Sequence, residues 1–313
     1  MTTLPLVRPE LRDFIQGFSM PSMNAERMAE RRNMPLPAPE AEETPDLEVT
    51  ERRIPGSAGG PDVRVLVFRP TNAKGPMPGI LHIHGGGYII GSPEASAPGN
   101  RQFASELGCV IVAPAYRLAP ETPFPGPLED CYAGLKWLHD NARELGVDPA
   151  RIAIKGESAG GGLGAGLALL ARDRGEVPVV FQCLTYPMID DRPAAEPHPY
   201  VGEFIWDPDS NHFGWSSYLG REPGGDGVSP YAAPARAEDL KGLPPALIIA
   251  GTLDLFMEEN LEYARRLTRA GVPVELQLYP GVYHGFGMAG DTEIARRYYR
   301  DCRDALASAL RVG

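Results

Sequence analysis

The chain has 313 residues, of which 43% are hydrophobic and 23% charged, and its formal net charge at pH 7 is −11. These proportions are ordinary for a water-soluble globular protein, and no apolar run is long enough to cross a bilayer. The acidic balance and the scattered arginines argue against nucleic acids and membrane surfaces as partners. Residues 1–10 lack the apolar segment of a secretory signal, so we expect a cytoplasmic protein.

The four cysteines, Cys109, Cys131, Cys183 and Cys302, are far apart in the sequence. Three of them fall within apolar strand or helix patterns. Buried free thiols are therefore expected, in place of a disulfide framework or a zinc site. We expect neither a metal nor a cofactor.

The first 46 residues read as a separate helical segment. Leu11, Phe14, Ile15 and Phe18 have helical spacing, and a second helix is predicted around residues 23–32. Residues 34–46 are proline-rich and acidic, with few large apolar groups. This composition predicts a linker to the main domain.

From Leu47 onward the pattern is that of strands. Eight strands are predicted, at residues 47–54, 63–68, 79–84, 110–114, 152–156, 179–187, 246–251 and 274–280. Helical patterns separate most of them, including those at 127–146, 159–175 and 258–271. Alternation of buried strands with helices predicts an α/β protein whose mostly parallel, eight-stranded sheet is covered on both faces.

Residues 190–236 interrupt this alternation. They contain proline-rich loops, a helix predicted near residues 209–219 and two of the three tryptophans. So long a connection inside a compact domain is typical of a lid. The predicted core is therefore split into residues 47–189 and 237–313.

Ser158 lies between Gly156 and Gly160 in a G-x-S-x-G pattern. A strand precedes the serine and a helix follows it, as in the nucleophile elbow of serine hydrolases. The helix dipole would favour negative charge developing at the serine. The same region also fits a dinucleotide-binding pattern at Gly160, Gly162 and Ala165, but that string begins inside the helix and no acidic residue ends the next strand, so we reject it.

A second glycine motif, His84-Gly85-Gly86-Gly87-Tyr88, directly follows the strand at residues 79–84. Successive glycines leave backbone N–H groups free to converge on a substrate oxygen. Lipases and esterases use a loop at this position for that purpose.

Three motifs together resemble one family. The glycine loop, "YRLAPE" at residues 116–121 and the Ser158 elbow are similar to those of the hormone-sensitive-lipase-like esterases, the bacterial family IV of the α/β-hydrolase fold. The resemblance covers about residues 47–313. It implies a carboxylesterase that prefers soluble esters with short to medium acyl chains, with residues 1–46 and 190–236 packed together as a cap over the serine. It also implies a possible homodimer formed through the last strand and helix.

The family order of the catalytic triad is serine, acid, histidine. His284 follows the last predicted strand in a glycine-containing loop, and Asp254 follows the strand at 246–251. We expect Ser158 to act as the nucleophile, His284 as the base and Asp254 as the orienting acid. Asp254 could instead cap the helix at 258–271. Glu258 replaces an aspartate of the family pattern and is a second candidate for the acid.

The resemblance implies further roles. The oxyanion hole is expected from the backbone N–H groups of Gly86, Gly87 and Ala159, with His84 bracing the glycine loop. Glu157 replaces the aspartate that usually precedes the serine, and Arg117 is expected to pair with Glu121. Aromatic side chains are expected to bind the substrate: Tyr88, Trp206, Phe213 and Trp215.

Two other functions remain open on the same motifs. Non-catalytic small-molecule receptors share this fold but lack the triad histidine, so the presence of His284 disfavours that function. An amidase or peptidase would use the same serine chemistry, although no added binding domain supports it.

Overall fold

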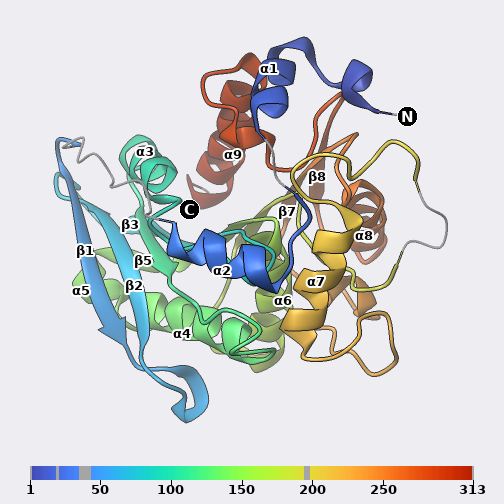
Figure 1. Cartoon of the computed structure of the whole chain (residues 1–313). Coiled ribbons are helices and arrows are strands. Elements are labelled where there is room, and N and C mark those ends of the chain that lie inside the picture. The colour runs from blue at the N-terminus through green and yellow to red at the C-terminus, as the bar shows by residue number, and fades with distance from the viewer. Residues whose placement is uncertain (1, 19–20, 35–43, 194–197, 312–313) are drawn as a thin grey trace.

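The computed structural model describes residues 2–18, 21–34, 44–193 and 198–311, and its centre is one eight-stranded sheet (Figure 1). The strands are ordered β1-β2-β4-β3-β5-β6-β7-β8. β1 and β2 pair antiparallel with their neighbours, and the other pairs are parallel. The predicted fold class is therefore confirmed. The strand bounds are β1 (Leu47–Ile54), β2 (Val63–Pro70), β3 (Met77–Ile83), β4 (Val110–Pro114), β5 (Val147–Glu157), β6 (Phe181–Thr185), β7 (Ala246–Gly251) and β8 (Val274–Tyr279).

Helices cover both faces of the sheet, because the central strands bury apolar side chains on both sides. In β3, Ile80 packs into one core cluster and Leu81 into the other. One cluster contains side chains from α4 (Gly126–Asp140), α6 (Ala159–Arg174) and α8 (Met257–Arg269). The other contains side chains from α1 (Pro9–Gly17), α3 (Ala97–Leu107) and α9 (Glu293–Arg311).

The helix predicted at residues 127–146 is two helices in the structure. α4 ends at Asp140, and a short helix, α5, runs from Ala142–Leu145. Between them, the side-chain amide of Asn141 donates to the carbonyl of Trp137 at 2.9 Å. Such a local side-chain bond competes with continuation of the helix, which accounts for the break.

The expected pairing of Arg117 with Glu121 is wrong. Arg117 donates to both carboxylate oxygens of the buried Asp130, at 2.8 and 2.7 Å. Glu121 pairs with Arg32 of the N-terminal segment, at 2.7 Å. A bidentate contact with a buried carboxylate is stronger than a single contact with an exposed one.

The N-terminal segment contacts the insertion at residues 190–236. The segment contains α1 and α2 (Ala25–Asn33), and the insertion contains α7 (Pro208–Leu219). The backbone N–H of Met23 donates to the hydroxyl of Ser210 at 2.8 Å, and Ser22 bonds the carboxylate of Asp207. Part of the predicted linker, residues 35–43, lies outside the described residues.

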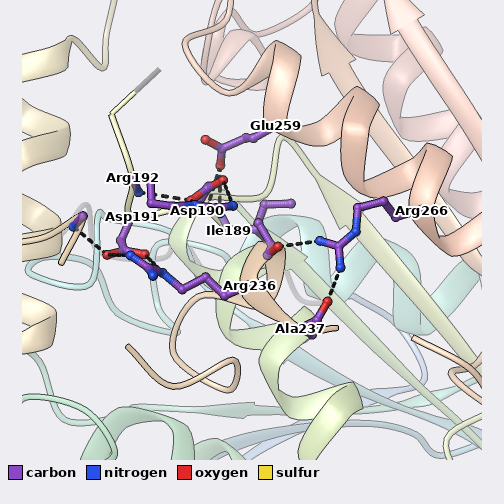
Figure 2. Close-up of polar contacts among 10 residues, drawn as sticks. Ile189, Asp190, Asp191, Arg192, Arg236, Ala237, Glu259 and Arg266 are labelled. Carbon is purple, nitrogen blue, oxygen red and sulfur yellow. Dashed lines mark hydrogen bonds and ion pairs between the residues drawn. The ribbon is translucent and has the colours of Figure 1, made fainter. Parts of the chain in front are cut away.

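The base of the insertion is closed by polar contacts, which Figure 2 shows. Asp191 at its start accepts two hydrogen bonds from Arg236 at its end, at 2.5 and 2.9 Å. Two side chains of α8 hold the adjoining backbone: Glu259 accepts from the N–H of Ile189 at 2.8 Å, and Arg266 donates to the carbonyl of Ala237. α8 therefore holds both ends of the insertion.

The four cysteines are unpaired and buried, as expected. Among the described helices, none combines the length and the apolar character needed to span a bilayer.

Candidate active site

The motif residues meet at one edge of the sheet. The glycine loop follows β3, Ser158 follows β5, Asp254 follows β7, and His284 follows β8. These four strands are parallel, so their carboxyl ends lie at the same edge. Ser158 and His284, which are 126 positions apart in the sequence, are thereby brought together. Ligand sites of open α/β sheets lie at this carboxyl edge of the strands.

Ser158 has the strained backbone of a nucleophile elbow, with φ 57° and ψ −123°. The turn is tight enough that a Cβ atom at Gly156 would lie 2.3 Å from the carbonyl oxygen of Gly160. A Cβ atom at Gly160 would lie 2.1 Å from the carbonyl oxygen of Ile83 in the neighbouring strand. Only glycine fits at both positions, which explains the G-x-S-x-G spacing in physical terms.

Ser158, His284 and Asp254 form one hydrogen-bonded chain. The Nε2 atom of His284 lies 2.9 Å from Oγ of Ser158, and its Nδ1 atom lies 2.9 Å from Oδ2 of Asp254. All three side chains are buried, and Asp254 has no exposed surface. Because a carboxylate can only accept, Nδ1 carries the proton and Nε2 is left as the acceptor facing the serine.

The orientation of this chain is fixed by its surroundings. The other carboxylate oxygen of Asp254 accepts from the backbone N–H of Phe256 at 2.9 Å. The imidazole ring of His284 has edge contacts with Tyr186 and Phe256, at centroid distances of 4.6 and 5.1 Å. The alternative role of Asp254 as a helix cap does not apply, because the residue at the N-cap position of α8 is Phe256.

Glu258, the second candidate for the acid, lies in the first turn of α8 and is exposed. None of the contacts of His284 involves Glu258. The structure therefore places Asp254, and not Glu258, beside the histidine.

The glycine loop contacts the elbow and the insertion closely. Gly86 and Gly87 have positive φ angles of 123° and 59°. A Cβ atom at Gly87 would lie 2.1 Å from the ring of Trp206, so the insertion covers the loop directly. Ala159, the third residue expected in the oxyanion hole, is the first residue of α6. The leading N–H groups of a helix have no intrahelical partner and can bind an anion.

A cavity of about 940 Å³ opens above Ser158 and is lined by Gly86, Gly87 and His284. Of the four aromatic residues expected to bind the substrate, Trp206 lines this cavity. The other three do not line it: Tyr88 and Trp215 are buried in the core, and Phe213 packs against the same core cluster. The sequence pattern could not separate a core position from a cavity wall, either within the insertion or at Tyr88, because both environments take large apolar side chains.

Glu157 is held by two buried partners. Its carboxylate is ion-paired with Lys155, and the Nε2 atom of His82 donates to it at 2.7 Å. Burial alone would raise the pKa of Glu157, but His82 and Lys155 hold this pKa well below its usual range. The longer side chain in place of the usual aspartate therefore serves a cluster that lines the cavity beside Ser158.

The cluster of Lys155, Glu157 and His82 was not predicted from the sequence. The signal was available, since a lysine and a histidine stand in two otherwise apolar central strands. β3 and β5 pair so that His82 lies opposite Lys155. Polar groups in buried central strands are rare unless they are paired, so adjacent examples indicate a shared contact.

His84 braces the glycine loop, as the resemblance implied. Its Nδ1 atom donates to the carbonyl of Gly85 at 2.8 Å, and its ring stacks on Tyr116 at a centroid distance of 4.2 Å. Burial lowers the pKa of His84 to about 4, so the ring is neutral at pH 7. The hydrogen bond and the stacking contact of its ring are with Gly85 and Tyr116, which accords with a supporting role.

Comparisons with known proteins agree with this geometry. A family model described as the alpha/beta hydrolase fold matches residues 80–288. The chain is 38% identical over 251 residues to the carboxylesterase NlhH of Mycobacterium tuberculosis, covering 77% of this chain and 76% of the relative. It is 34% identical to the esterase LipI of the same organism over 261 residues, which cover 79% of this chain and 77% of that relative.

Solved structures give the same result over nearly the whole chain. A bacterial heroin esterase superposes with a TM-score of 0.90 at 40% identity, covering 99% of this chain and 100% of that one. An esterase of the archaeon Pyrobaculum calidifontis superposes with a TM-score of 0.82 at 33% identity, covering 96% and 98%. The elbow, the glycine loop, the sheet and these matches together show that the chain belongs to the hormone-sensitive-lipase-like esterases of the α/β-hydrolase fold.

Proposed function

We propose that this ester hydrolase works through Ser158, His284 and Asp254, with the oxyanion held by the backbone N–H groups of Gly86, Gly87 and Ala159. The observation that carries the assignment is the continuous hydrogen-bonded chain from Asp254 through His284 to Ser158, with 2.9 Å at each step. Ser158 and His284 of this chain line a cavity of about 940 Å³, from which an ester can reach the serine.

The reaction follows from these positions. Oγ of Ser158 attacks the ester carbonyl carbon while Nε2 of His284 takes its proton, and the carbonyl oxygen becomes an oxyanion beside the glycine loop. When the carbon–oxygen bond to the alcohol breaks, His284 gives the proton to the departing alkoxide. Water then repeats the sequence on the acyl-enzyme, and the acid is released with the serine restored. Asp254 keeps the imidazole in the required tautomer throughout.

We propose esters with short to medium acyl chains as the substrates. Trp206 lines the cavity and lies against Gly87 of the glycine loop, and the charged side chains of Lys155 and Glu157 line the same cavity as Ser158. A wall with buried charges disfavours a long alkyl chain, because the chain would desolvate them without offering hydrogen bonds. Pure enzyme assayed with p-nitrophenyl esters of 2 to about 16 carbons should show its highest kcat/KM at the shorter lengths.

We also propose that residues 1–46 and 190–236 act together as the cap over a core of residues 47–189 and 237–313. The contacts of Met23 with Ser210 and of Ser22 with Asp207 support this division. Trp206 of the insertion and Phe18 of the N-terminal segment both line the cavity.

The catalytic assignment is tested with Ser158→Ala. This variant should fold with an unchanged circular-dichroism spectrum and lose turnover of p-nitrophenyl butyrate by at least about 10³-fold, since the nucleophile is removed. Full activity in this variant would exclude the assignment.

The same assay separates the two other functions. A non-catalytic receptor would bind an ester without turning it over, and the 2.9 Å contact between His284 Nε2 and Ser158 Oγ supports turnover instead. An amidase or peptidase would cleave a p-nitroanilide of the same acyl group at a kcat/KM comparable with that of the p-nitrophenyl ester.

We also propose homodimerisation through β8 and α9. β8 is an edge strand of the sheet, and Leu276 and Leu278 on it are each 39% exposed. An exposed apolar edge strand is a ready template for pairing with a second copy. Sedimentation velocity should show a dimer for the wild type and a monomer for Leu278→Lys. A wild type that sediments as a monomer at micromolar concentration would rule the proposal out.

A cytoplasmic location is proposed as well. The four cysteines are free and buried, which fits a reducing compartment better than an oxidising one. Fractionation of cells that produce the protein should recover the esterase activity in the cytosolic fraction.

A further inference from the structure

Tyr88 has a different role from the substrate contact expected of it. Its side chain has no exposed surface, and its hydroxyl donates to the carbonyl of Met188 at 2.7 Å. Its ring stacks on Tyr218 of α7 with centroids 4.0 Å apart. The hydroxyl group is thus committed to a backbone carbonyl that lies 100 positions further along the chain.

Met188 is in turn bonded to the nucleophile elbow. Its backbone N–H donates to the carbonyl of Ser158 at 3.0 Å. That carbonyl and the N–H of Ala159 are the two ends of one planar peptide unit. Fixing the direction of the Ser158 carbonyl therefore fixes the direction in which the Ala159 N–H points.

Tyr88 also directly follows the other half of the oxyanion hole. Gly86 and Gly87 precede it in the sequence, and Tyr88 itself has a positive φ of 67°, which is rare for a side chain of this size. One residue therefore connects the glycine loop, through Met188, to the peptide that carries Ala159.

We infer that Tyr88 is a positioning residue that sets the spacing between the two halves of the oxyanion hole. The inference rests on the proposed function of Gly86, Gly87 and Ala159. A donor array is effective only when its N–H groups are aimed in advance at the developing oxyanion, so a hydrogen bond that fixes their relative direction acts on the transition state.

The glycine run after the serine supports this role independently. A Cβ atom at Gly162 would lie 2.0 Å from the carbonyl oxygen of Met188 and 2.4 Å from the hydroxyl of Tyr88. Gly162 therefore leaves the space in which this hydrogen bond forms. The elbow motif itself ends at Gly160, so it does not explain this glycine.

The segment that contains Met188 is held from its other side by α8. The side-chain amide of Asn260 donates to the carbonyl of Pro187 at 2.7 Å. Glu259 accepts from the N–H groups of Ile189 and Asp190, at 2.8 and 3.3 Å (Figure 2). With both sides fixed, the segment provides a rigid point on which the Tyr88 hydroxyl can act.

The test compares Tyr88→Phe with Tyr218→Phe. The two tyrosines are stacked and equally buried, but among the described residues the hydroxyl of Tyr218 has no hydrogen-bond partner. Tyr88→Phe should lower kcat for p-nitrophenyl butyrate about 10-fold and leave KM within about twofold. The reason is that the variant loses the bond that orients the Ala159 N–H, while the N–H group itself remains. Tyr218→Phe should leave both constants unchanged.

A transition-state analogue gives a second readout. An alkyl trifluoromethyl ketone adds Ser158 to its carbonyl and places an oxyanion in the hole. Its inhibition constant should rise about 10-fold in Tyr88→Phe, in parallel with the fall in kcat. If kcat and the inhibition constant of Tyr88→Phe equal those of Tyr218→Phe, the inference is overturned, whether both variants match the wild type or both lose activity to the same extent. A wild type without turnover, whose Ser158 is not labelled by a fluorophosphonate, would overturn the proposed function and this inference with it.

Discussion

At the scale of single residues, the structure separates two carboxylates that the sequence left as candidates. Asp254 is buried against His284, and Glu258 is exposed four residues later. Their chemistry is the same, so only their positions distinguish them. This makes the pair a matched test of the proposed acid.

We predict that Asp254→Asn lowers kcat by about 10³- to 10⁴-fold, because an amide at this position favours the wrong imidazole tautomer. Glu258→Gln should leave kcat unchanged. Steady-state kinetics with p-nitrophenyl butyrate on both variants measures the difference. A large loss in Glu258→Gln would move the role of the acid to that residue.

The flanking glycines give a second prediction at this scale. Gly160→Ala would bring a Cβ atom within 2.1 Å of the carbonyl of Ile83 and 2.4 Å of that of His84, both rigid backbone atoms. We expect the free energy of unfolding to fall by about 1–3 kcal/mol or more, as for overpacked cores. Gly17→Ala in α1, where nothing lies within 4 Å of the new Cβ atom, is the control and should be neutral or stabilising. Urea denaturation measures both, and equal stabilities would contradict the packing explanation.

At the scale of elements, α8 connects the proposed acid to the insertion. The helix begins three residues after Asp254, and its side chains Glu259 and Arg266 hold the two ends of the insertion (Figure 2). The base itself is closed by Asp191 and Arg236, whose side chains are 0% and 14% exposed. This buried ion pair joins the start and the end of the insertion and so helps to hold it in one position.

We predict that Arg236→Met lowers the free energy of unfolding by about 3–5 kcal/mol, because it leaves the carboxylate of Asp191 buried without its cation. The double variant Asp191→Asn/Arg236→Met should recover part of that loss, since the charge is removed as well. Urea denaturation of the two variants gives the comparison. If the double variant has a lower free energy of unfolding than Arg236→Met, this account is contradicted.

At the scale of the whole molecule, the buried histidines make stability depend on pH. Burial lowers the pKa of His84 from 6.5 to about 4, and it also lowers the pKa of His82. Between these pH values the unfolded chain binds a proton that the folded chain does not. Stability is therefore lost as the pH falls below about 6.5.

We predict that the free energy of unfolding decreases steadily from pH 6.5 to pH 5, with a contribution from His84 of about 1.4 kcal/mol per pH unit at most. In His84→Phe this part of the slope should disappear, whatever the variant's overall stability. Urea denaturation at half-unit pH intervals measures both slopes. Identical slopes would show that His84 takes up its proton in the folded state as readily as in the unfolded chain.

The sequence alone predicted much of this protein correctly. The eight strands, their mostly parallel arrangement and the family were all available from apolar runs and from short motifs, because these features depend on neighbouring residues in the chain. The G-x-S-x-G elbow belongs to this group as a motif, and Gly156 is required by a contact within its own strand–turn–helix unit. Gly160 is required by the carbonyl of Ile83 in the neighbouring strand β3.

Contacts between distant segments were decided by the tertiary structure. Arg117 pairs with the buried Asp130 and not with the nearer Glu121. Glu157 of β5 bonds His82 of β3, and the Tyr88 hydroxyl bonds the carbonyl of Met188 within the core. The physical reason is that a polar group leaving water takes the partner with the best geometry in space, and distance along the chain does not determine that geometry. Local pattern therefore specified the elements and the reactive motifs, and packing specified which side chains support them.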